Sequence, residues 1–343
     1  MVLLVAARNE AEVVAETVSD LICHASQVSV IADRCIDDTA AVAAAAGARV
    51  YVRHEGEGGK GAALAWFMSV AAHEMAEVDA VIILDADSRL APGSLEAIAQ
   101  AFAAGAEAVQ AFVQPVGVEG SPVAALSAYS ELLSQRIGDK IRSALGWTVP
   151  LRGFGMAFRT ELLREIVTGL RTRTEDIELS LRLARRGVRV WFVEQATVYN
   201  PQPQGLRWAA NQRARWLQGQ AQVWRHYGRD ILRLLLTGGP NAWSLLWALL
   251  LKPKTLVTLL KVGLLALVAL LPIRPPALQG ALLCLTGAAV AMDVAYYLVG
   301  LLLVRERGLY ARALLAAPLY IAMWLWSLLL APLARRTWLR ARD

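Results

Sequence analysis

Charged side chains are scarce in this sequence: only 19% of its 343 residues are Asp, Glu, Lys or Arg, while 56% are hydrophobic. A soluble globular chain averages about 25% charged residues. Its three cysteines (Cys23, Cys35 and Cys284) form no CxxC pair, and its four histidines are scattered. These shortages exclude a disordered tail protein, a disulfide framework and a zinc cluster of the usual spacing, and they indicate that part of the chain lies in lipid.

Several familiar catalytic signatures are also missing. The sequence contains no HExxH, no GxSxG and no GxGxxG after a strand. The glycine-rich stretch 56–61 is not a P-loop, because His54 stands at the position of its first glycine and Gly61 replaces the Ser or Thr after Lys60. Lys60 can still reach a phosphate from this stretch; the alternative is an ordinary glycine-rich turn.

Charge is unevenly distributed along the chain. Residues 241–343 hold eleven basic and three acidic side chains, whereas residues 1–240 hold 24 and 26. The formal net charge of +6 therefore comes from the tail. Basic residues beside apolar stretches favour anionic lipid headgroups. We expect no nucleic-acid partner, because the basic groups form no compact patch with a known binding motif.

Strand and helix patterns alternate over the first 115 residues, which predicts an α/β fold with a mostly parallel sheet and helices on both sides. The run 80–84 is continuously apolar and is followed by Asp85, as in a central strand buried on both faces. The expected strands are 2–6, 28–32, 49–53, 80–84, 108–114, 155–159 and 189–193. The expected helices are 39–46, 61–75, 92–104, 123–141 and 176–186.

Three long apolar stretches follow Pro240, at 255–271, 277–304 and 313–333, and each is close to or above the roughly 20 residues that span a bilayer as a helix. With Trp and Tyr near their ends they resemble membrane spans; the alternative is a buried helical bundle. Three crossings from a cytoplasmic domain would leave the basic C-terminus outside, against the positive-inside bias. We therefore expect that one stretch is re-entrant, or that the shorter piece 245–251, which we otherwise place at the interface, also crosses.

The predicted organisation is a catalytic domain at 1–200, amphipathic interfacial helices at 201–240 and about three transmembrane helices at 241–343. Asp293 lies within the second apolar stretch, where a charge is costly, so we expect it to face protein. The N-terminal apolar run is too short for a signal peptide, and a strand is expected to begin almost at Met1. A domain rarely begins so abruptly, so an upstream segment that is missing from this sequence is an open alternative.

The strand 80–84 ends in Asp85-Ala86-Asp87. Residues i and i+2 of a strand project to one side, so both carboxylates can reach one hard cation, Mg²⁺ or Mn²⁺.

Asp33, at the end of the strand 28–32, can accept hydrogen bonds from a base or ribose. The alternative is a helix start with Asp37 or Asp38 as N-cap; we expect Asp33 to be functional and Asp38 structural.

Two further motifs lie toward the C-terminal side. Thr174-Glu175-Asp176 opens a predicted helix, where Thr174 suits the N-cap and the helix dipole favours an ionised Asp176, as a general base requires. In Gln212-Arg213-Ala214-Arg215-Trp216, positions i, i+3 and i+4 share a helix face, which combines an amide, a guanidinium and a flat ring. Arg suits a diphosphate and Trp stacks on a sugar or base. The alternative explanations are a capped helix start and an interfacial amphipathic helix.

In this order and at these intervals, the motifs resemble those of the inverting family 2 glycosyltransferases. The resemblance is closest to the membrane-integrated branch, which includes cellulose, chitin, hyaluronan and poly-N-acetylglucosamine synthases and ceramide glucosyltransferase. It covers residues 1–235. Dolichol-phosphate sugar transferases usually lack the motif seen at 212–216. The resemblance implies a GT-A-like catalytic domain that uses a UDP-sugar donor, a glycan or lipid acceptor and Mg²⁺ or Mn²⁺.

The resemblance also implies roles for individual residues. Asp176 is the catalytic base with Glu175 beside it, and Asp87 binds the metal with Asp85. The nucleotide-sugar residues are Ala6 (where the family commonly has proline), Arg8, Glu10, Asp33, Lys60, Asp85 and Arg215. The residues for the acceptor or diphosphate are Gly153, Phe154, Gln212, Arg213 and Trp216.

The expected function is therefore an inverting hexosyltransferase of the inner membrane, with a cytoplasmic catalytic domain, that makes a polysaccharide or a glycolipid. Membrane lipids, a second copy or an accessory membrane subunit are possible partners. Synthases of long polymers usually have more membrane helices than this chain, so a lipid-linked or short-chain acceptor stays open. The non-enzymatic alternative is a membrane-anchored nucleotide-sugar sensor or scaffold, which would need no base. A transporter is disfavoured by the small number of helices.

Overall fold

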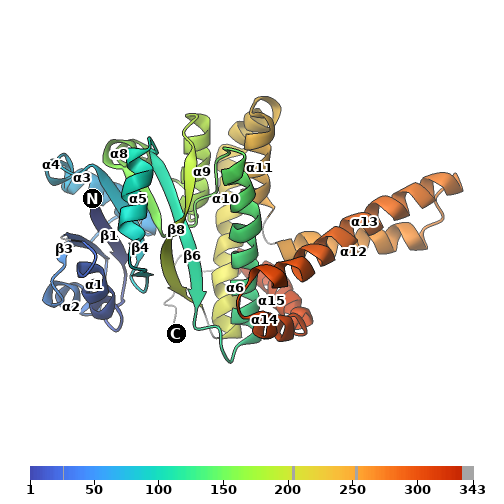
Figure 1. Ribbon diagram of the computed structural model, residues 1–343, viewed down its shortest axis with the longest axis horizontal. Helices are drawn as coiled ribbons and strands as arrows, with labels where there is room; N and C mark the ends of the chain where they lie inside the picture. The colour runs from blue at the N-terminus through green and yellow to red at the C-terminus, as the bar shows by residue number, and fades with distance from the viewer. Residues whose placement is uncertain (26, 203–204, 252–253, 334–343) are drawn as a thin grey trace.

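A single sheet organises the first two hundred residues. The computed structural model describes residues 1–25, 27–202, 205–251 and 254–333, and within them the sheet has eight strands in the order β3-β2-β1-β4-β7-β6-β8-β5 (Figure 1). Pairing is parallel among β3, β2, β1 and β4 and between β6 and β8; β7 and β5 pair antiparallel with their neighbours. The strands are β1 (Val2–Ala7), β2 (Val28–Asp33), β3 (Arg49–Arg53), β4 (Ala80–Asp85), β5 (Arg89–Leu90), β6 (Ala108–Val116), β7 (Met156–Arg159) and β8 (Val190–Pro201).

Helices cover both faces of the sheet, as the apolar strands require. One core contains the alternate strand residues Leu3, Val5, Ile82 and Leu84. The opposite core contains Val2, Leu4, Val81 and Ile83. The helices packed on the first face are α1 (Val14–Ile22), α2 (Thr39–Ala45) and α5 (Ser94–Ala103). Those on the second face are α3 (Lys60–Val70), α4 (Ala72–Met75), α8 (Thr160–Val167) and α9 (Glu175–Arg185).

The strand order places a topological switch point between β1 and β4. Strands β2 and β3 lie on one side of β1, and β4 begins the other half of the sheet. Ala6 and Asp85 are register partners at the carboxyl ends of these two strands. Open α/β sheets bind ligands outside the carboxyl ends of their strands at such a point, because the two halves of the sheet diverge there. The motif Asp85-Ala86-Asp87 therefore lies at the edge of the sheet where a ligand is expected.

One long helix joins the sheet domain to the rest of the chain. Helix α10 (Leu206–Thr237) is a single helix of 32 residues, where we expected several interfacial helices at 201–240. Its first half packs with α6 (Pro122–Leu133), α14 (Arg307–Leu314) and α15 (Ala317–Leu330) in one apolar core. Its second half packs with α9 and α11 (Gly239–Leu250) in another. Helix α10 therefore packs against both the α/β domain and the C-terminal helices.

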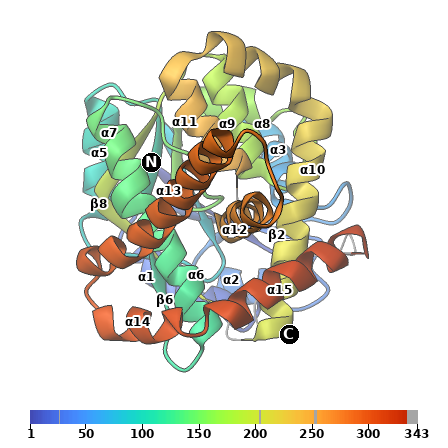
Figure 2. The ribbon, with the colours of Figure 1, turned by 90° about the vertical axis from the view of Figure 1, so that its right-hand side faces the viewer.

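Two apolar helices form a hairpin that projects from the body (Figures 1 and 2). They are α12 (Lys254–Leu270) and α13 (Pro276–Gly300), which pack mainly on each other. Their outer surface is apolar and open: Leu260 is 73% exposed, Leu270 82% and Met292 72%. Asp293 faces protein as expected, because Lys261 Nζ lies 2.8 Å from its Oδ1 and Thr258 donates to its Oδ2 at 2.8 Å. This ion pair joins the two helices inside an apolar unit.

The described residues allow between one and three membrane spans, where we expected about three. Among the described residues one helix, Pro276–Leu303, is long and apolar enough to cross a membrane, with a mean hydropathy of 1.8. The count reaches three only if two bent helix pairs, α11 with α12 and α14 with α15, each form one span. Helices α14 and α15 meet at 64°, and the bend lies just before Pro318, which occupies the first turn of α15. The stretch 313–333 is therefore broken at Leu315–Ala316, where Pro318 has no N–H to donate to the carbonyl of Leu314.

Most expected elements are present, with local corrections. The expected helix 61–75 is interrupted at Ala71, and the expected helix 123–141 contains a π-helix, η1 (Ser134–Asp139), before α7 (Lys140–Ala144). The strand at 189–193 continues to Pro201. Asp38 occupies the N-cap position of α2 without a capping hydrogen bond. The side chain of Asp37 instead binds a free backbone donor at the start of α2, because its Oδ1 accepts from the backbone N–H of Thr39 at 3.2 Å.

Candidate functional site

A cavity of about 510 Å³ opens at the switch point and runs along α10. Its wall combines residues of the sheet edge, the loop before β7, the start of α9 and the C-terminal helices. Fourteen of the fifteen residues that sequence analysis selected line it: Ala6, Arg8, Glu10, Lys60, Asp85, Asp87, Gly153, Phe154, Glu175, Asp176, Gln212, Arg213, Arg215 and Trp216. Motifs that are far apart in the sequence therefore share one space.

Asp33 is the one residue of these fifteen that does not line the cavity. Its side chain is 2% exposed and its Oδ1 lies 2.9 Å from Arg53 Nη1 and 3.4 Å from Arg34 Nε. Asp33 and Arg53 are register partners at the ends of β2 and β3, so the ion pair follows directly from the strand pairing. Contact between Asp33 and a base stays a prediction, and it would require these arginines to share the carboxylate.

Lys60 links the glycine-rich loop to the motif Asp85-Ala86-Asp87. Its side chain is 6% exposed, and Nζ donates to Asp85 Oδ1 and, at 2.8 Å, to the carbonyl oxygen of Gly153. Gly59, the residue before it, has φ of 124°, a conformation that favours glycine and turns the chain into α3. Lys60 therefore neutralises one carboxylate oxygen at the mouth of the cavity and holds it against the loop at 152–155.

The loop Arg152-Gly153-Phe154-Gly155 is fixed by a glutamine in the adjacent strand. Gln110 is fully buried in β6; its Nε2 donates to the carbonyl of Phe154 at 3.1 Å, and its Oε1 accepts from Arg152 N at 3.0 Å. Gly155 has φ of 62°, and a Cβ there would lie 3.0 Å from Val198. The loop is thus held rigidly where it faces Glu175.

Arg152 is the centre of a buried ion network below this loop. Its guanidinium binds both Asp139, which is fully buried, and Glu131, which is 30% exposed and lines the cavity. Arg142 completes the network at 3.2 Å from Asp139 and donates to Ser244 of α11. Burial alone would lower the pKa of Arg152, but the two carboxylates raise it above its ordinary value. The charge of Arg152 is therefore retained, and it ties α6 to the π-helix.

The Thr174-Glu175-Asp176 motif starts α9 against α10. Thr174 occupies the N-cap position but makes no capping bond. Its Oγ1 is buried and has no partner among the residues that the structure describes. The reason is close packing: a Cβ on Gly219 of α10 would lie 2.3 Å from Thr174 Cγ2 and 2.9 Å from its Oγ1. Gly219 therefore lets α10 approach the residues next to Glu175 and Asp176.

We expect Gly219→Ala to push α10 away from Thr174. Overpacking of this kind costs about 1–3 kcal/mol, against about 1 kcal/mol gained from helix propensity. Gly228→Ala on the same helix is the matched control, because a Cβ there meets nothing within 4 Å. Thermal unfolding in detergent should show a lower midpoint for Gly219→Ala and an equal or higher one for Gly228→Ala. Equal midpoints for the two variants would contradict the packing argument.

The two carboxylates of the motif influence each other. Burial and then the charge of Asp176 raise the pKa of Glu175 to about 8, although Lys60 acts in the opposite direction. A Glu175 that keeps its proton at neutral pH can donate a hydrogen bond, whereas a general base must be ionised.

The raised pKa of Glu175 makes stability depend on pH. Its ordinary value is 4.5, so between about 4.5 and 8 the folded protein holds a proton that the unfolded chain has released. The free energy of unfolding therefore falls as the pH rises through this window. Glu175→Gln removes this dependence. We expect the stability of the variant relative to wild type to increase from pH 5 to pH 8, measured by chemical denaturation; a constant difference would refute the shift.

The motif at 212–216 divides into two roles. Gln212, Arg215 and the 47%-exposed Trp216 line the cavity. Arg213 also lines it but is only 2% exposed, and it donates to Ser127 of α6 and lies 5.3 Å from the ring centres of Tyr320 and Trp324. These contacts join α10 to α6 and α15. Arg213 therefore also has a structural function that the motif did not reveal.

Arg173 and Arg215 give this part of the cavity a positive charge. Both line it, and burial followed by the charge of Arg173 lowers the pKa of Arg215 from its ordinary value. Arg173 Nη1 is oriented by Gln218 Oε1 at 2.5 Å. Two like charges that line the same cavity raise its affinity for an anion. The arrangement is suited to the phosphates of a nucleotide.

Divalent metal binding can be tested against the donor atoms. Among the described residues, no group of three or more His, Cys, Asp or Glu side chains is placed to hold a metal ion. Asp85 and Asp87 both line the cavity at the end of β4. Mg²⁺ commonly takes one or two carboxylates, with substrate phosphates and waters completing its shell. The pair of carboxylates therefore fits a metal that binds together with a nucleotide.

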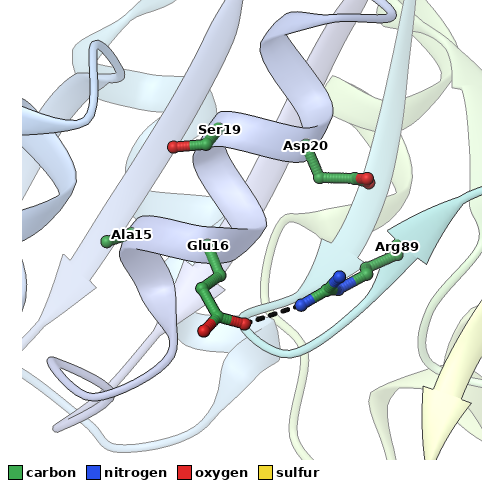
Figure 3. A pocket seen from close by; sticks show the side chains of 5 residues that line it. All are labelled: Ala15, Glu16, Ser19, Asp20 and Arg89. Atoms are coloured by element: carbon green, nitrogen blue, oxygen red, sulfur yellow. Dashed lines mark hydrogen bonds and ion pairs between the residues drawn. The ribbon is translucent and has the colours of Figure 1, made fainter.

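A second hollow lies outside this site, beside α1 (Figure 3). Its lining includes Glu16 and Arg89, whose side chains form an exposed ion pair with Oε2 and Nη2 2.6 Å apart. None of the residues selected from the sequence lines it.

Comparison of the sequence with models of protein families decides the family. A family model described as glycosyltransferase like family 2 matches residues 1–219, which is more than half of the chain. The chain belongs to glycosyltransferase family 2. No curated protein matches the chain. The sheet and the helices on its faces are the GT-A-like arrangement that the motifs led us to expect.

Solved structures to which part of this chain is similar include glucosyl-3-phosphoglycerate synthase from Mycobacterium tuberculosis. One, in complex with Mg²⁺ and UDP, is 24% identical, with 57% of this chain and 68% of the synthase covered and a TM-score of 0.39. Another, with Mn²⁺, UDP-glucose and phosphoglyceric acid, is 24% identical over 57% and 69%, with a TM-score of 0.40. A further mycobacterial protein is 23% identical over 58% of this chain, which spans 65% of that protein's length, with a TM-score of 0.39.

Sequence analysis missed several residues of the site. Gln110, Glu131, Asp139 and Arg173 hold or line the cavity but belong to no motif. Gln110 had a signal, because it is a polar residue in the apolar strand pattern at 108–113. A buried polar side chain needs partners, which predicts a role in fixing neighbouring backbone.

Proposed function

We propose that the protein is a membrane-bound, inverting glycosyltransferase that moves a sugar from a UDP-sugar to a hydroxyl of a glycan or lipid acceptor. The observation that carries this proposal is the shared cavity. It brings the Asp85 and Asp87 carboxylates, the Glu175–Asp176 pair and the Arg215–Trp216 face into one space. A nucleotide site needs the first and last of these sets, and sugar transfer to a hydroxyl needs a base between them as well.

The proposed reaction is a single displacement. Asp176 takes the proton of the acceptor hydroxyl as its oxygen attacks the anomeric carbon. The new carbon–oxygen bond forms on the face opposite UDP, while the bond from that carbon to the diphosphate oxygen breaks and UDP leaves with the electron pair. Configuration therefore inverts. Glu175 keeps its proton near neutral pH and can hydrogen-bond the substrate or Asp176, which holds the pair in one geometry.

Positive charge supports the leaving group. Arg215 and Arg173 line the cavity where a diphosphate can neutralise them, and such preorganised charge stabilises a departing anion. Asp87, with Asp85, would hold a divalent metal ion, which as a Lewis acid would neutralise charge that develops on the diphosphate. Lys60 stays on Asp85 and fixes its orientation. Trp216 offers an exposed ring on which a sugar can stack.

The membrane location is part of the same proposal. The hairpin of α12 and α13 has an apolar outer surface and a helix of sufficient length to cross a bilayer. Apolar side chains exposed over a whole hairpin favour lipid, a second copy or an accessory membrane subunit as their surroundings. We place the protein in the inner membrane with the catalytic domain on the cytoplasmic side, where nucleotide sugars are made.

Donor-dependent UDP release tests this function. The purified protein in detergent is given UDP-glucose, UDP-N-acetylglucosamine, UDP-galactose or UDP-glucuronate with membrane lipid extract and Mg²⁺ or Mn²⁺. We expect release from one donor, and loss of release with EDTA that is restored by excess metal. UDP binding without release from any donor would favour the sensor or scaffold, which requires no base.

A further inference from the structure

The cavity continues beyond the carboxylates into the C-terminal helices. Its far wall is formed by Leu249 of α11, Thr255 in the first turn of α12, and Tyr320 and Trp324 of α15. None of these residues has a part in the displacement described above. Thr255 marks the base of the apolar hairpin, so this end of the cavity adjoins the surface that we assign to lipid.

A polar stripe lies beside this wall on α6. Ser127, Ser130 and Glu131 have the spacing i, i+3 and i+4, so they share one helix face, and all three line the cavity. Glu131 is pinned by Arg152 and is still 30% exposed. A fixed, partly exposed carboxylate accepts hydrogen bonds from hydroxyl groups. The stripe therefore offers a site for a hydroxylated headgroup.

Arg213 contacts both the polar stripe on α6 and the part of the wall that α15 forms. It donates to Ser127 and lies 5.3 Å from the ring centres of both Tyr320 and Trp324. Trp324 is 5% exposed, and its indole N–H has no hydrogen-bond partner among the described residues. An unpartnered buried donor in a cavity wall is costly, and an oxygen atom of a ligand would satisfy it.

We propose that the acceptor is a hydroxyl-bearing lipid, which binds with its head against the α6 stripe and its chain along the wall of Leu249, Thr255 and Trp324. This inference rests on the proposed function and specifies its acceptor. A cavity of about 510 Å³ is within the size range of a single small-ligand site, about 300–1,000 Å³. The stripe and the wall belong to parts of the cavity lining that none of the predicted nucleotide-sugar residues form. The remainder of the chain would follow the hairpin into the bilayer.

Photolabelling tests the lipid site without knowledge of the natural headgroup. The probe is a monoacylglycerol with a diazirine in its acyl chain, incorporated in phosphatidylcholine nanodiscs with the full chain. Labelled peptides are mapped by mass spectrometry. We expect labels on the peptides that contain Leu249 and Trp324, in addition to the hairpin surface that faces lipid.

Two variants and a matched control separate the cavity from the lipid-facing surface. Thr255→Trp narrows the chain end and should reduce cavity labels at least fivefold, while Leu260→Trp, on the exposed side of the same helix, should not. Glu131→Gln should weaken cavity labelling about tenfold, because it loses a hydrogen bond to a charged group. Gel filtration of each variant identifies any that misfold.

Labels confined to the hairpin surface, or cavity labels equal in wild type and Thr255→Trp, would overturn the lipid site. UDP affinity is measured on the same samples. Wild-type protein that binds UDP but carries no cavity label contradicts the lipid acceptor alone, whereas protein that carries the label without binding UDP contradicts the proposed transferase.

Discussion

Replacement of Asp176 by Asn is expected to reduce sugar transfer by about 10²- to 10⁴-fold, the usual contribution of a positioned general base. Asn has the same shape but cannot take the proton of the acceptor hydroxyl. In the proposed mechanism the donor is bound by the end of β4 and by Arg215, so the affinity for UDP should change little. The measurement is UDP release under saturating donor, together with UDP binding by calorimetry.

A matched control for Asp176→Asn is Asp230→Asn. Asp230 lies on α10 away from the cavity and forms an exposed ion pair with Arg185, at 3.0 Å. This variant should transfer sugar at the wild-type rate. Transfer by Asp176→Asn within about threefold of wild type would remove Asp176 from the role of base, given the magnitude expected for such a group.

The second large effect concerns stability. Arg152→Met should lower the free energy of unfolding by about 3–5 kcal/mol, because removing one partner leaves a buried charge without compensation. Asp139 is fully buried, and among the described residues it would keep Arg142 alone as an ionic partner. Glu131 would lose the ion pair that holds it at the cavity. Denaturation in detergent should show the loss, and transfer should fall with it because the loop at 152–155 loses its anchor.

Arg89→Met supplies the comparison for this variant. Arg89 and Glu16 form an ion pair in which both side chains are at least half exposed (Figure 3). Exposed pairs contribute about 0–1 kcal/mol, since water screens them and solvates either partner alone. A loss for Arg152→Met no larger than that for Arg89→Met would contradict the structural importance of the buried network.

Local sequence patterns predicted the half of the site that strands and helix ends position. The apolar run of β4 ends at Asp85, and a parallel sheet brings that carboxylate to the same edge as Ala6. The start of α9 was marked by its acidic first turn. These features depend on residues within one element and on the general rule for sheet edges, so the sequence was sufficient for them.

Contacts between distant elements were not predictable in this way. Asp33 is a strand-end acid like Asp85, but the arginine that pairs with it ends the neighbouring strand, and the register was needed to see this. Arg213 was assigned to the acceptor or diphosphate because the motif at 212–216 resembles that of the family. Only the packing of α6 and α15 against α10 shows that it binds Ser127 and the Trp324 ring. The break of helix 61–75 at Ala71 has no glycine or proline to mark it.

The anomeric configuration of the product tests the central claim most directly. The donor identified by UDP release, in its α-linked form, is supplied with lipid acceptor, and the purified product is examined by NMR. A single displacement with Asp176 as base predicts a β-linked sugar, absent when Asp176→Asn replaces the wild type. An α-linked product would contradict the account, because it would require retention of configuration through a second displacement.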